Sequence, residues 1–216
     1  MPNPPPAHAP SRQRKLAALH GIYALVDPEQ RPAEPFVADL LAGGIRLFQI
    51  RAKGGLRRET LAAIVTMVRA AGGVTLVNDD VAAAADADGL HVGQGDAALL
   101  DLAAVRARLG DGVIGLSCST PGEARAVDPA IIDYLGIGPL FATATKPDAG
   151  LPLGVNGVRA VVAATRLPTA AIGGIDLARL PRVRETGATM VAIISALSSA
   201  TDVTATARAL VTAWDL

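Results

Sequence analysis

The feature that most constrains this chain is a repeated alternation of short apolar runs with helix-like segments. Eight runs of apolar or β-branched residues follow residue 20, at 22–26, 47–50, 74–77, 89–92, 113–116, 134–137, 169–172 and 190–194. The segments between them are rich in Ala, Leu, Arg and Glu with helical spacing, for example 56–71, 98–109, 121–127, 155–165 and 177–186. The pattern predicts strands that alternate with helices.

The apolar runs are continuously hydrophobic, which is typical of parallel strands that are covered on both faces. Glycines stand where a helix must end before the next strand, at Gly43, Gly44, Gly72, Gly73, Gly110 and Gly187. Eight such units in about 200 residues predict an α/β fold, a single TIM (β/α)8 barrel. An open doubly wound sheet is the alternative, but the Gly-x-Gly-x-x-Gly fingerprint expected after its first strand is absent.

The length of 216 residues fits one domain with a sizeable core. Half of the residues are hydrophobic, 19% are charged and the net charge is zero, which excludes a wholly disordered chain. Five prolines among the first ten residues predict a disordered, flexible N-terminal arm over 1–14, and the barrel is expected over 15–216. Few aromatic residues and no excess of basic ones argue against nucleic acid as a partner.

The chain has no uninterrupted apolar run of the roughly 18 residues that a membrane helix needs. Residues 12–26 have some character of an export signal, but their core at 22–26 fits a buried strand better. The single cysteine, Cys118, cannot form an internal disulfide. We therefore expect a cytoplasmic protein with no membrane partner.

The active site of a TIM barrel lies at the carboxyl ends of its strands, so the residues that end each run are functional candidates. The polar and glycine residues at these positions are Gln49, Arg51, Lys53, Asn78, Asp79, Asp80, His91, Gln94, Asp96, Ser117, Thr143, Thr145, Lys146, Gly173, Gly174 and Ser195. The fold would bring them to one face of the barrel.

The lysines are informative because the chain uses arginine almost everywhere else. Its only lysines are Lys15, Lys53 and Lys146, and the last two follow strands. An ammonium group suits a phosphate oxygen, and the guanidinium of Arg51 can bind a phosphate in a bidentate manner. The alternative is that Lys53 and Lys146 are solvated loop residues.

Two carboxylates, Asp79 and Asp96, follow different strands and offer the oxygen ligands that Mg²⁺ takes together with water and substrate phosphates. Helix capping is an open alternative, in which Asp79 or Asp80 caps a helix near residue 81 and Asp96 starts the next helix. His91 is either a hydrogen-bonded core residue or a ligand contact, and a lone histidine makes a zinc site a poor interpretation.

A second anion site is suggested by Gly173 and Gly174 after the seventh run and Ser195 after the eighth, where TIM barrels often bind phosphate. A tight turn without a ligand is the alternative for the glycines. The connection at 141–153 is longer than a usual βα loop and is a candidate lid.

At these positions the sequence resembles the thiamine-phosphate synthase family. The matching stretches are QIRAK at 49–53, ND at 78–79, DGLHVGQGD at 88–96, GPLFATATKP at 138–147, AIGGI at 171–175 and ISA at 194–196. They span nearly the whole expected barrel in the right order. The family joins 4-amino-2-methyl-5-hydroxymethylpyrimidine diphosphate to 4-methyl-5-(2-phosphoethyl)thiazole, which releases pyrophosphate.

The resemblance implies a transferase with Mg²⁺ as cofactor and two phosphorylated small molecules as substrates. It implies that the pyrimidine diphosphate is bound by Gln49, Arg51, Lys53, Asn78, Ser117 and Lys146, with Arg51, Lys53 and Lys146 catalytic. It places Mg²⁺ on Asp79 and Asp96, and the thiazole phosphate on Thr143, Thr145, Gly174, Ile194 and Ser195. The oligomeric state stays open, and a homo-oligomer is compatible with the sequence.

Two positions depart from the family pattern: Asp80 is often basic in relatives, and Ser119 stands where many relatives have histidine. The alternatives to the synthase are a thiazole tautomerase, whose catalytic histidine would fall at Ser119, and a non-catalytic protein that binds thiamine precursors. The complete set of Arg51, Lys53, Asp79, Asp96 and Lys146 favours the synthase.

Overall fold

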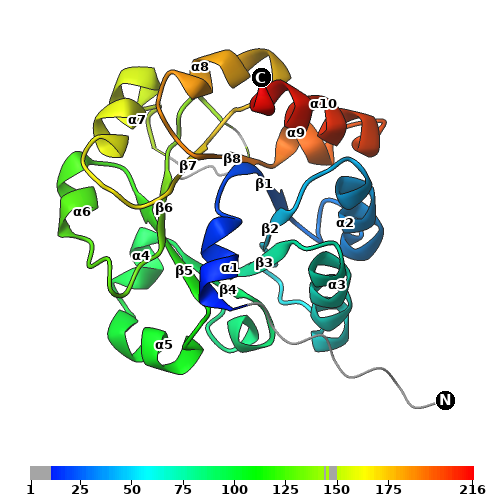
Figure 1. Cartoon of the computed structure of the whole chain (residues 1–216), viewed down its shortest axis with the longest axis horizontal. Coiled ribbons are helices and arrows are strands. Elements are labelled where there is room, and N and C mark those ends of the chain that lie inside the picture. Colours follow the sequence, from blue (N-terminus) through cyan, green and yellow to red (C-terminus); the bar gives the residue numbers. More distant parts are fainter. Residues whose placement is uncertain (1–10, 144, 146–149) are drawn as a thin grey trace.

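The computed structural model describes residues 11–143, 145 and 150–216, and its centre is a closed barrel of eight parallel strands (Figure 1). The strands are β1 (Gly21–Val26), β2 (Leu47–Ile50), β3 (Val74–Asn78), β4 (Gly89–Val92), β5 (Val113–Cys118), β6 (Tyr134–Ile137), β7 (Thr169–Ile172) and β8 (Met190–Ile193). Each strand pairs with its sequence neighbours, and β8 closes the ring on β1, with Gly21 opposite Met190. The predicted TIM-barrel fold is confirmed.

Most of the helices surround the barrel on its outside, and α1 lies over one of its ends (Figure 1). They are α1 (Arg12–Ala17), α2 (Ala33–Ala42), α3 (Arg58–Ala70), α4 (Gln94–Ala97), α5 (Leu102–Leu109), α6 (Pro121–Ala126), α7 (Gly154–Val162), α8 (Leu180–Arg184), α9 (Ser195–Ser198) and α10 (Val203–Asp215), with 3-10 turns η1 (Ala83–Asp86) and η2 (Leu177–Arg179). The helix expected at 98–109 begins only at Leu102, because the side chain of Asp101 accepts from the amide of Ala104 and caps α5 there.

Apolar side chains form two layers, one between the strands and the helices and one inside the barrel. The inner layer consists of Leu19, Tyr23, Leu25, Leu47, Val74, Leu76, Val113, Tyr134, Ala170, Met190 and Ala192. Alternate residues of β1–β3 and β5–β8 face these two layers, so apolar side chains cover both faces of these strands. This explains why the strands are continuously apolar in the sequence.

Helix α1 lies across the end of the barrel where the strands begin (Figure 1). Lys15 is almost fully buried there and faces Asp88, which also pairs with Arg69, while Arg12 and Arg106 both pair with Asp133. Burial is the main cause that lowers the pKa of Lys15 below its ordinary value. These ion pairs close the end of the barrel opposite the predicted site.

Since α1 begins at Arg12, the described chain is already helical before residue 15, and the extent of the N-terminal arm stays a prediction.

None of the helices in the described part of the chain combines the length and the apolar character needed to cross a bilayer.

Candidate active site

A cavity of about 520 Å³ opens at the carboxyl ends of the strands. It is lined by the predicted site residues Gln49, Arg51, Lys53, Asn78, Asp79, Asp96, Ser117, Thr143, Thr145, Gly174, Ile194 and Ser195. The remaining predicted residue, Lys146, lies outside the described residues. Seven of the barrel strands therefore send predicted groups into one cavity, as the argument from strand ends requires.

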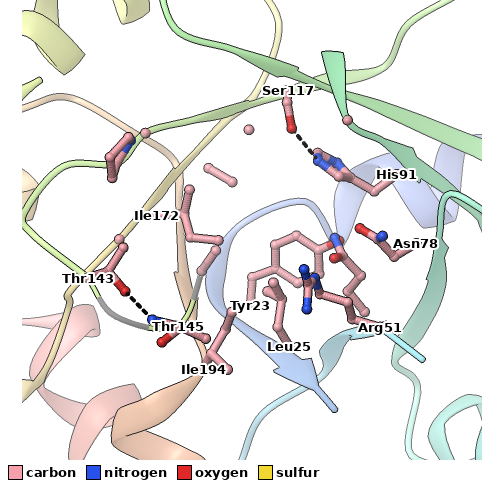
Figure 2. A pocket seen from close by; sticks show the side chains of 18 of the residues that line it. Tyr23, Leu25, Arg51, Asn78, His91, Ser117, Thr143, Thr145, Ile172 and Ile194 are labelled. Atoms are coloured by element: carbon pink, nitrogen blue, oxygen red, sulfur yellow. Dashed lines mark hydrogen bonds between the residues drawn. The ribbon is translucent and has the colours of Figure 1, made fainter. Parts of the chain in front are cut away.

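One side of the cavity carries positive charge from the segment after β2. Arg51 continues the strand ladder, because its backbone N–H donates to the carbonyl of Val26 at 2.9 Å, and its side chain reaches the cavity together with Asn78 (Figure 2). Within the described part of the chain, neither the guanidinium of Arg51 nor the ammonium of Lys53 has a hydrogen-bonding or ion-pair partner. Both cations are available to an anionic ligand.

The two carboxylates of Asp79 and Asp96 flank Gly93. A Cβ atom on Gly93 would lie 3.2 Å from Oδ2 of Asp96 and 3.9 Å from Oδ1 of Asp79, so the glycine leaves room between them. Asp79 is held by the amide of Gly93, which donates to Oδ1 at 3.0 Å, and by the side-chain amide of Asn78. Its backbone is left-handed, with φ of 61°, which is uncommon outside glycine and is often found at functional sites.

In the structure, other aspartates make the capping hydrogen bonds that were the alternative role for Asp79 and Asp96. Asp80, not Asp79, accepts from the amides of Ala82 and Ala83 at 2.9 Å and begins the turn at η1. Asp101, not Asp96, caps α5. The side chain of Asp96 is exposed and has no partner among the described residues, so its carboxylate faces the cavity without a structural role.

The opposite side of the cavity comes from the segments after β6, β7 and β8, where Thr143, Thr145 and Ile194 lie across from Arg51 and Asn78 (Figure 2). The amide of Thr145 donates to Oγ1 of Thr143 at 3.2 Å. Gly173 and Gly174 both have positive φ, of 110° and 61°. These glycines form a turn that most other residues would strain.

Sequence reasoning missed Tyr23 and Tyr134 as parts of this site. Both line the floor of the cavity, where Tyr134 hydrogen bonds to His91 and His91 in turn to Ser117. His91 is thus a buried, hydrogen-bonded residue that also lines the cavity, and its contact with a ligand stays a prediction. The only available signal was that the chain's two tyrosines both stand inside apolar strands.

Cys118 lines the cavity wall but is buried, and burial is the largest cause that raises the pKa of its thiol to about 11. A thiol with so high a pKa is a poor nucleophile at neutral pH. This supports a packing role for Cys118.

Fold and site together define a class of protein: a TIM-barrel enzyme with a polar cavity at the carboxyl ends of its strands. Within that class the sequence settles the family. The family model described as thiamine monophosphate synthase matches residues 22–197, so the chain belongs to the thiamine monophosphate synthase family.

Known relatives agree with this assignment. The chain is 42% identical over 186 residues to a thiamine-phosphate synthase of Moorella thermoacetica, covering 83% of this chain and 87% of the relative. It is 42% identical over 211 residues to a thiamine-phosphate synthase of Geobacillus kaustophilus, covering 94% of each. Among solved structures, a thiamine phosphate pyrophosphorylase from Pyrococcus furiosus superposes with a TM-score of 0.82 at 27% identity, covering 93% of this chain and 98% of that one.

Proposed function

We propose that this chain is a thiamine-phosphate synthase, a transferase that joins 4-amino-2-methyl-5-hydroxymethylpyrimidine diphosphate to 4-methyl-5-(2-phosphoethyl)thiazole and releases pyrophosphate. The observation that carries the proposal is that, in a chain of this family, one cavity is lined by two separate sets of residues whose chemistry suits phosphate. Two phosphorylated small molecules are therefore the proposed partners, with no role for nucleic acid. A cytoplasmic location and assembly into a homo-oligomer stay predictions.

The pyrimidine diphosphate is proposed to bind Gln49, Arg51, Lys53, Asn78, Ser117 and Lys146. Among the described residues, the cations of Arg51 and Lys53 have no hydrogen-bonding or ion-pair partner, which supports this assignment because a diphosphate would supply the negative charge that balances them. Lys146 is proposed to act with them, although it lies outside the described residues. The thiazole phosphate is assigned to Thr143, Thr145, Gly174, Ile194 and Ser195 on the other side.

The donor set of Asp79 and Asp96 fits Mg²⁺, because both are hard carboxylates separated by the space that Gly93 leaves open. The part of the chain that the structure describes holds no group of three or more His, Cys, Asp or Glu side chains able to bind a metal. The remaining ligands would accordingly be water and diphosphate oxygens, which is how Mg²⁺ is commonly held. When bound, the ion would neutralise negative charge on the diphosphate.

The chemistry requires a good leaving group more than a base. Pyrophosphate departs from the pyrimidine methylene carbon, the carbon–oxygen bond electrons stay on pyrophosphate, and the ring amino group stabilises the resulting cation. The thiazole nitrogen then attacks with its lone pair and has no proton to lose. Arg51 and Lys53 stabilise the leaving charge, and the second anion site holds the nucleophile in line.

An assay with both substrates and Mg²⁺, followed for thiamine phosphate and pyrophosphate, tests the proposal. Formation of both products in equal amounts is expected. Isomerisation of a thiazole alone would instead support the tautomerase, and binding without turnover would support the non-catalytic protein. The presence of Ser119 at the histidine position of the tautomerase makes the first of these the weaker alternative.

A further inference from the structure

The floor of the cavity contains a continuous chain of hydrogen bonds that crosses the barrel. The side-chain nitrogen of Gln49 donates to the hydroxyl of Tyr23 at 2.8 Å, and the hydroxyls of Tyr23 and Tyr134 are 2.8 Å apart. The hydroxyl of Tyr134 is 2.8 Å from Nδ1 of His91, whose Nε2 is 3.1 Å from Oγ of Ser117. Five residues from β1, β2, β4, β5 and β6 are thereby connected.

This series of hydrogen bonds lies in the interior of the barrel, where a TIM barrel usually has branched apolar side chains. Gln49, Tyr23, His91 and Tyr134 are between 0% and 8% exposed. Two strand glycines make room for the rings. A Cβ on Gly136 would lie 2.9 Å from Cε1 of His91, and a Cβ on Gly115 would overlap the ring of Tyr134.

The donors and acceptors define a direction along the chain. The Tyr23 oxygen accepts from Gln49, and among the described residues the acceptor within reach of its own proton is the Tyr134 oxygen, so the direction assigned here has Tyr23 donating to Tyr134. Tyr134 then donates to Nδ1 of His91. With Nδ1 accepting, the ring proton is on Nε2, which donates to Oγ of Ser117. Burial raises the pKa of both tyrosines above their ordinary value, so both hydroxyls keep their protons.

The direction leaves a different free group at each end. Oε1 of Gln49 accepts no hydrogen bond from the described residues. The Ser117 hydroxyl accepts from His91, and its own proton is not donated to any member of this hydrogen-bond series. Both residues line the cavity, which therefore offers one acceptor and one donor. An aminopyrimidine ring needs this pair, because its amino group donates and its ring nitrogens accept.

We infer that Tyr23 and Tyr134 are positioning residues for the pyrimidine substrate: they orient the Gln49 amide and, through the Nε2–H tautomer of His91, the Ser117 hydroxyl. This inference rests on the proposed function, in which Gln49 and Ser117 contact that substrate. Neither tyrosine is required to touch the substrate itself. Tyr23 contacts the Gln49 end of the hydrogen-bond series and Tyr134 contacts the His91–Ser117 end, which makes the inference testable.

The first test is the tautomer of His91 in the ligand-free wild-type protein, read from long-range ¹H–¹⁵N NMR correlations and assigned by comparison with His91→Asn. A proton on Nε2 alone is expected. A proton on Nδ1, or on both nitrogens, would overturn the inferred direction. This measurement needs no turnover, so it judges the inference even if the protein makes no thiamine phosphate, a result that would overturn the proposed function instead.

The second test compares Tyr134→Phe with Tyr23→Phe, each of which keeps the ring. Tyr134→Phe removes the donor to His91, so we expect a mixed tautomer and a KM for the pyrimidine diphosphate raised about tenfold, with the KM for the thiazole phosphate unchanged. Tyr23→Phe removes the acceptor of the Gln49 amide and the hydrogen bond from Tyr23 to Tyr134, but it leaves the hydrogen bond between Tyr134 and His91 in place. The same KM should therefore rise while His91 keeps its Nε2 proton. Equal rises in both KM values, or none, would contradict the inference.

Thr75→Val is the matched control, because it removes a buried strand hydroxyl that has no hydrogen-bond partner among the described residues and is not part of the hydrogen-bond series from Gln49 to Ser117. It should change neither the His91 tautomer nor either KM. Thermal unfolding of every variant shows whether the barrel remains folded. If Tyr134→Phe does not fold, the wild-type tautomer and Tyr23→Phe still decide the inference.

Discussion

Gly174 lies directly against the carbonyl oxygen of Ala142, so that a Cβ atom on Gly174 would overlap it. This contact joins the turn after β7 to the segment after β6. Arg179 reinforces the junction, because its guanidinium donates to the Gly174 carbonyl and lies 5.1 Å from the centre of the Phe141 ring. The proposed thiazole phosphate site therefore depends on the close approach of two loops.

Gly174→Ala should disturb this site. The substitution both strains a left-handed backbone at φ of 61° and pushes the turn away from Ala142. We expect the KM for the thiazole phosphate to rise at least tenfold, with a smaller change in the KM for the pyrimidine diphosphate. Steady-state kinetics with each substrate varied in turn measures both values.

Gly72→Ala is the control for backbone strain alone, since Gly72 has φ of 77° but a Cβ atom added there would meet no other atom within 4 Å. It should lower the free energy of unfolding by about 1 kcal/mol and leave both KM values unchanged. Identical kinetics for Gly174→Ala and wild type would remove Gly174 from the phosphate site.

Arg51→Ala should reduce kcat/KM strongly without loss of stability. The guanidinium makes no hydrogen bond or ion pair with described residues that the substitution would break, whereas the leaving diphosphate would lose a bidentate partner. We expect a loss of about 100-fold or more, only partly restored in Arg51→Lys, because lysine keeps the charge but not the fork of donors. Arg58→Ala, which removes an exposed ion pair with Asp86, should leave kcat/KM unchanged. A loss below threefold for Arg51→Ala would contradict the assigned role.

Strand ends were predictable because they follow from periodicity alone. Apolar runs place Arg51 and Asp79 after strands and Ser117 near the end of one, and parallel strands in a closed barrel must bring their ends together. The chain of Tyr23, Tyr134 and His91 was not predictable, because it depends on which strand residues face inward and on the space left by Gly115 and Gly136. Sequence spacing also could not tell which aspartate caps a turn, since that choice depends on backbone angles such as the positive φ of Asp79.

Asp96→Ala should weaken the response to Mg²⁺. Its exposed carboxylate supports no other part of the described structure, so stability should not change. We expect the Mg²⁺ concentration for half-maximal velocity to rise at least tenfold, measured by titration into metal-depleted enzyme. Asp101→Ala provides the contrast: loss of the α5 cap should cost about 1 kcal/mol of stability and leave the Mg²⁺ titration unchanged. Superimposable titrations for Asp96→Ala and wild type would exclude Asp96 as a ligand.

Glu123 ties the segment after β5 to the segment after β4, which carries Asp96. Its carboxylate accepts from the amides of Ser119 at 2.7 Å and Thr120 at 3.1 Å and from the side chain of Gln94 at 2.5 Å. The Ser119 amide is the first cause that lowers the pKa of Glu123 below its ordinary value of 4.5. A lowered pKa means that the ionised carboxylate stabilises the fold above the unfolded pKa, and that this contribution is lost as the pH falls through the folded pKa.

Glu123→Gln should therefore be less stable than wild type at pH 7, by about 1 kcal/mol, and the gap should close as the pH is lowered from about 5 to about 3. Urea unfolding at a series of pH values measures it. Glu185→Gln is the matched control, because the interactions of the Glu185 carboxylate with described residues are exposed ion pairs with Arg159 and Arg182, at 3.9 and 3.7 Å. That variant should differ little from wild type at any pH. A Glu123→Gln gap of the same size at pH 7 and at pH 3 would show that the charge of Glu123 does not stabilise this junction.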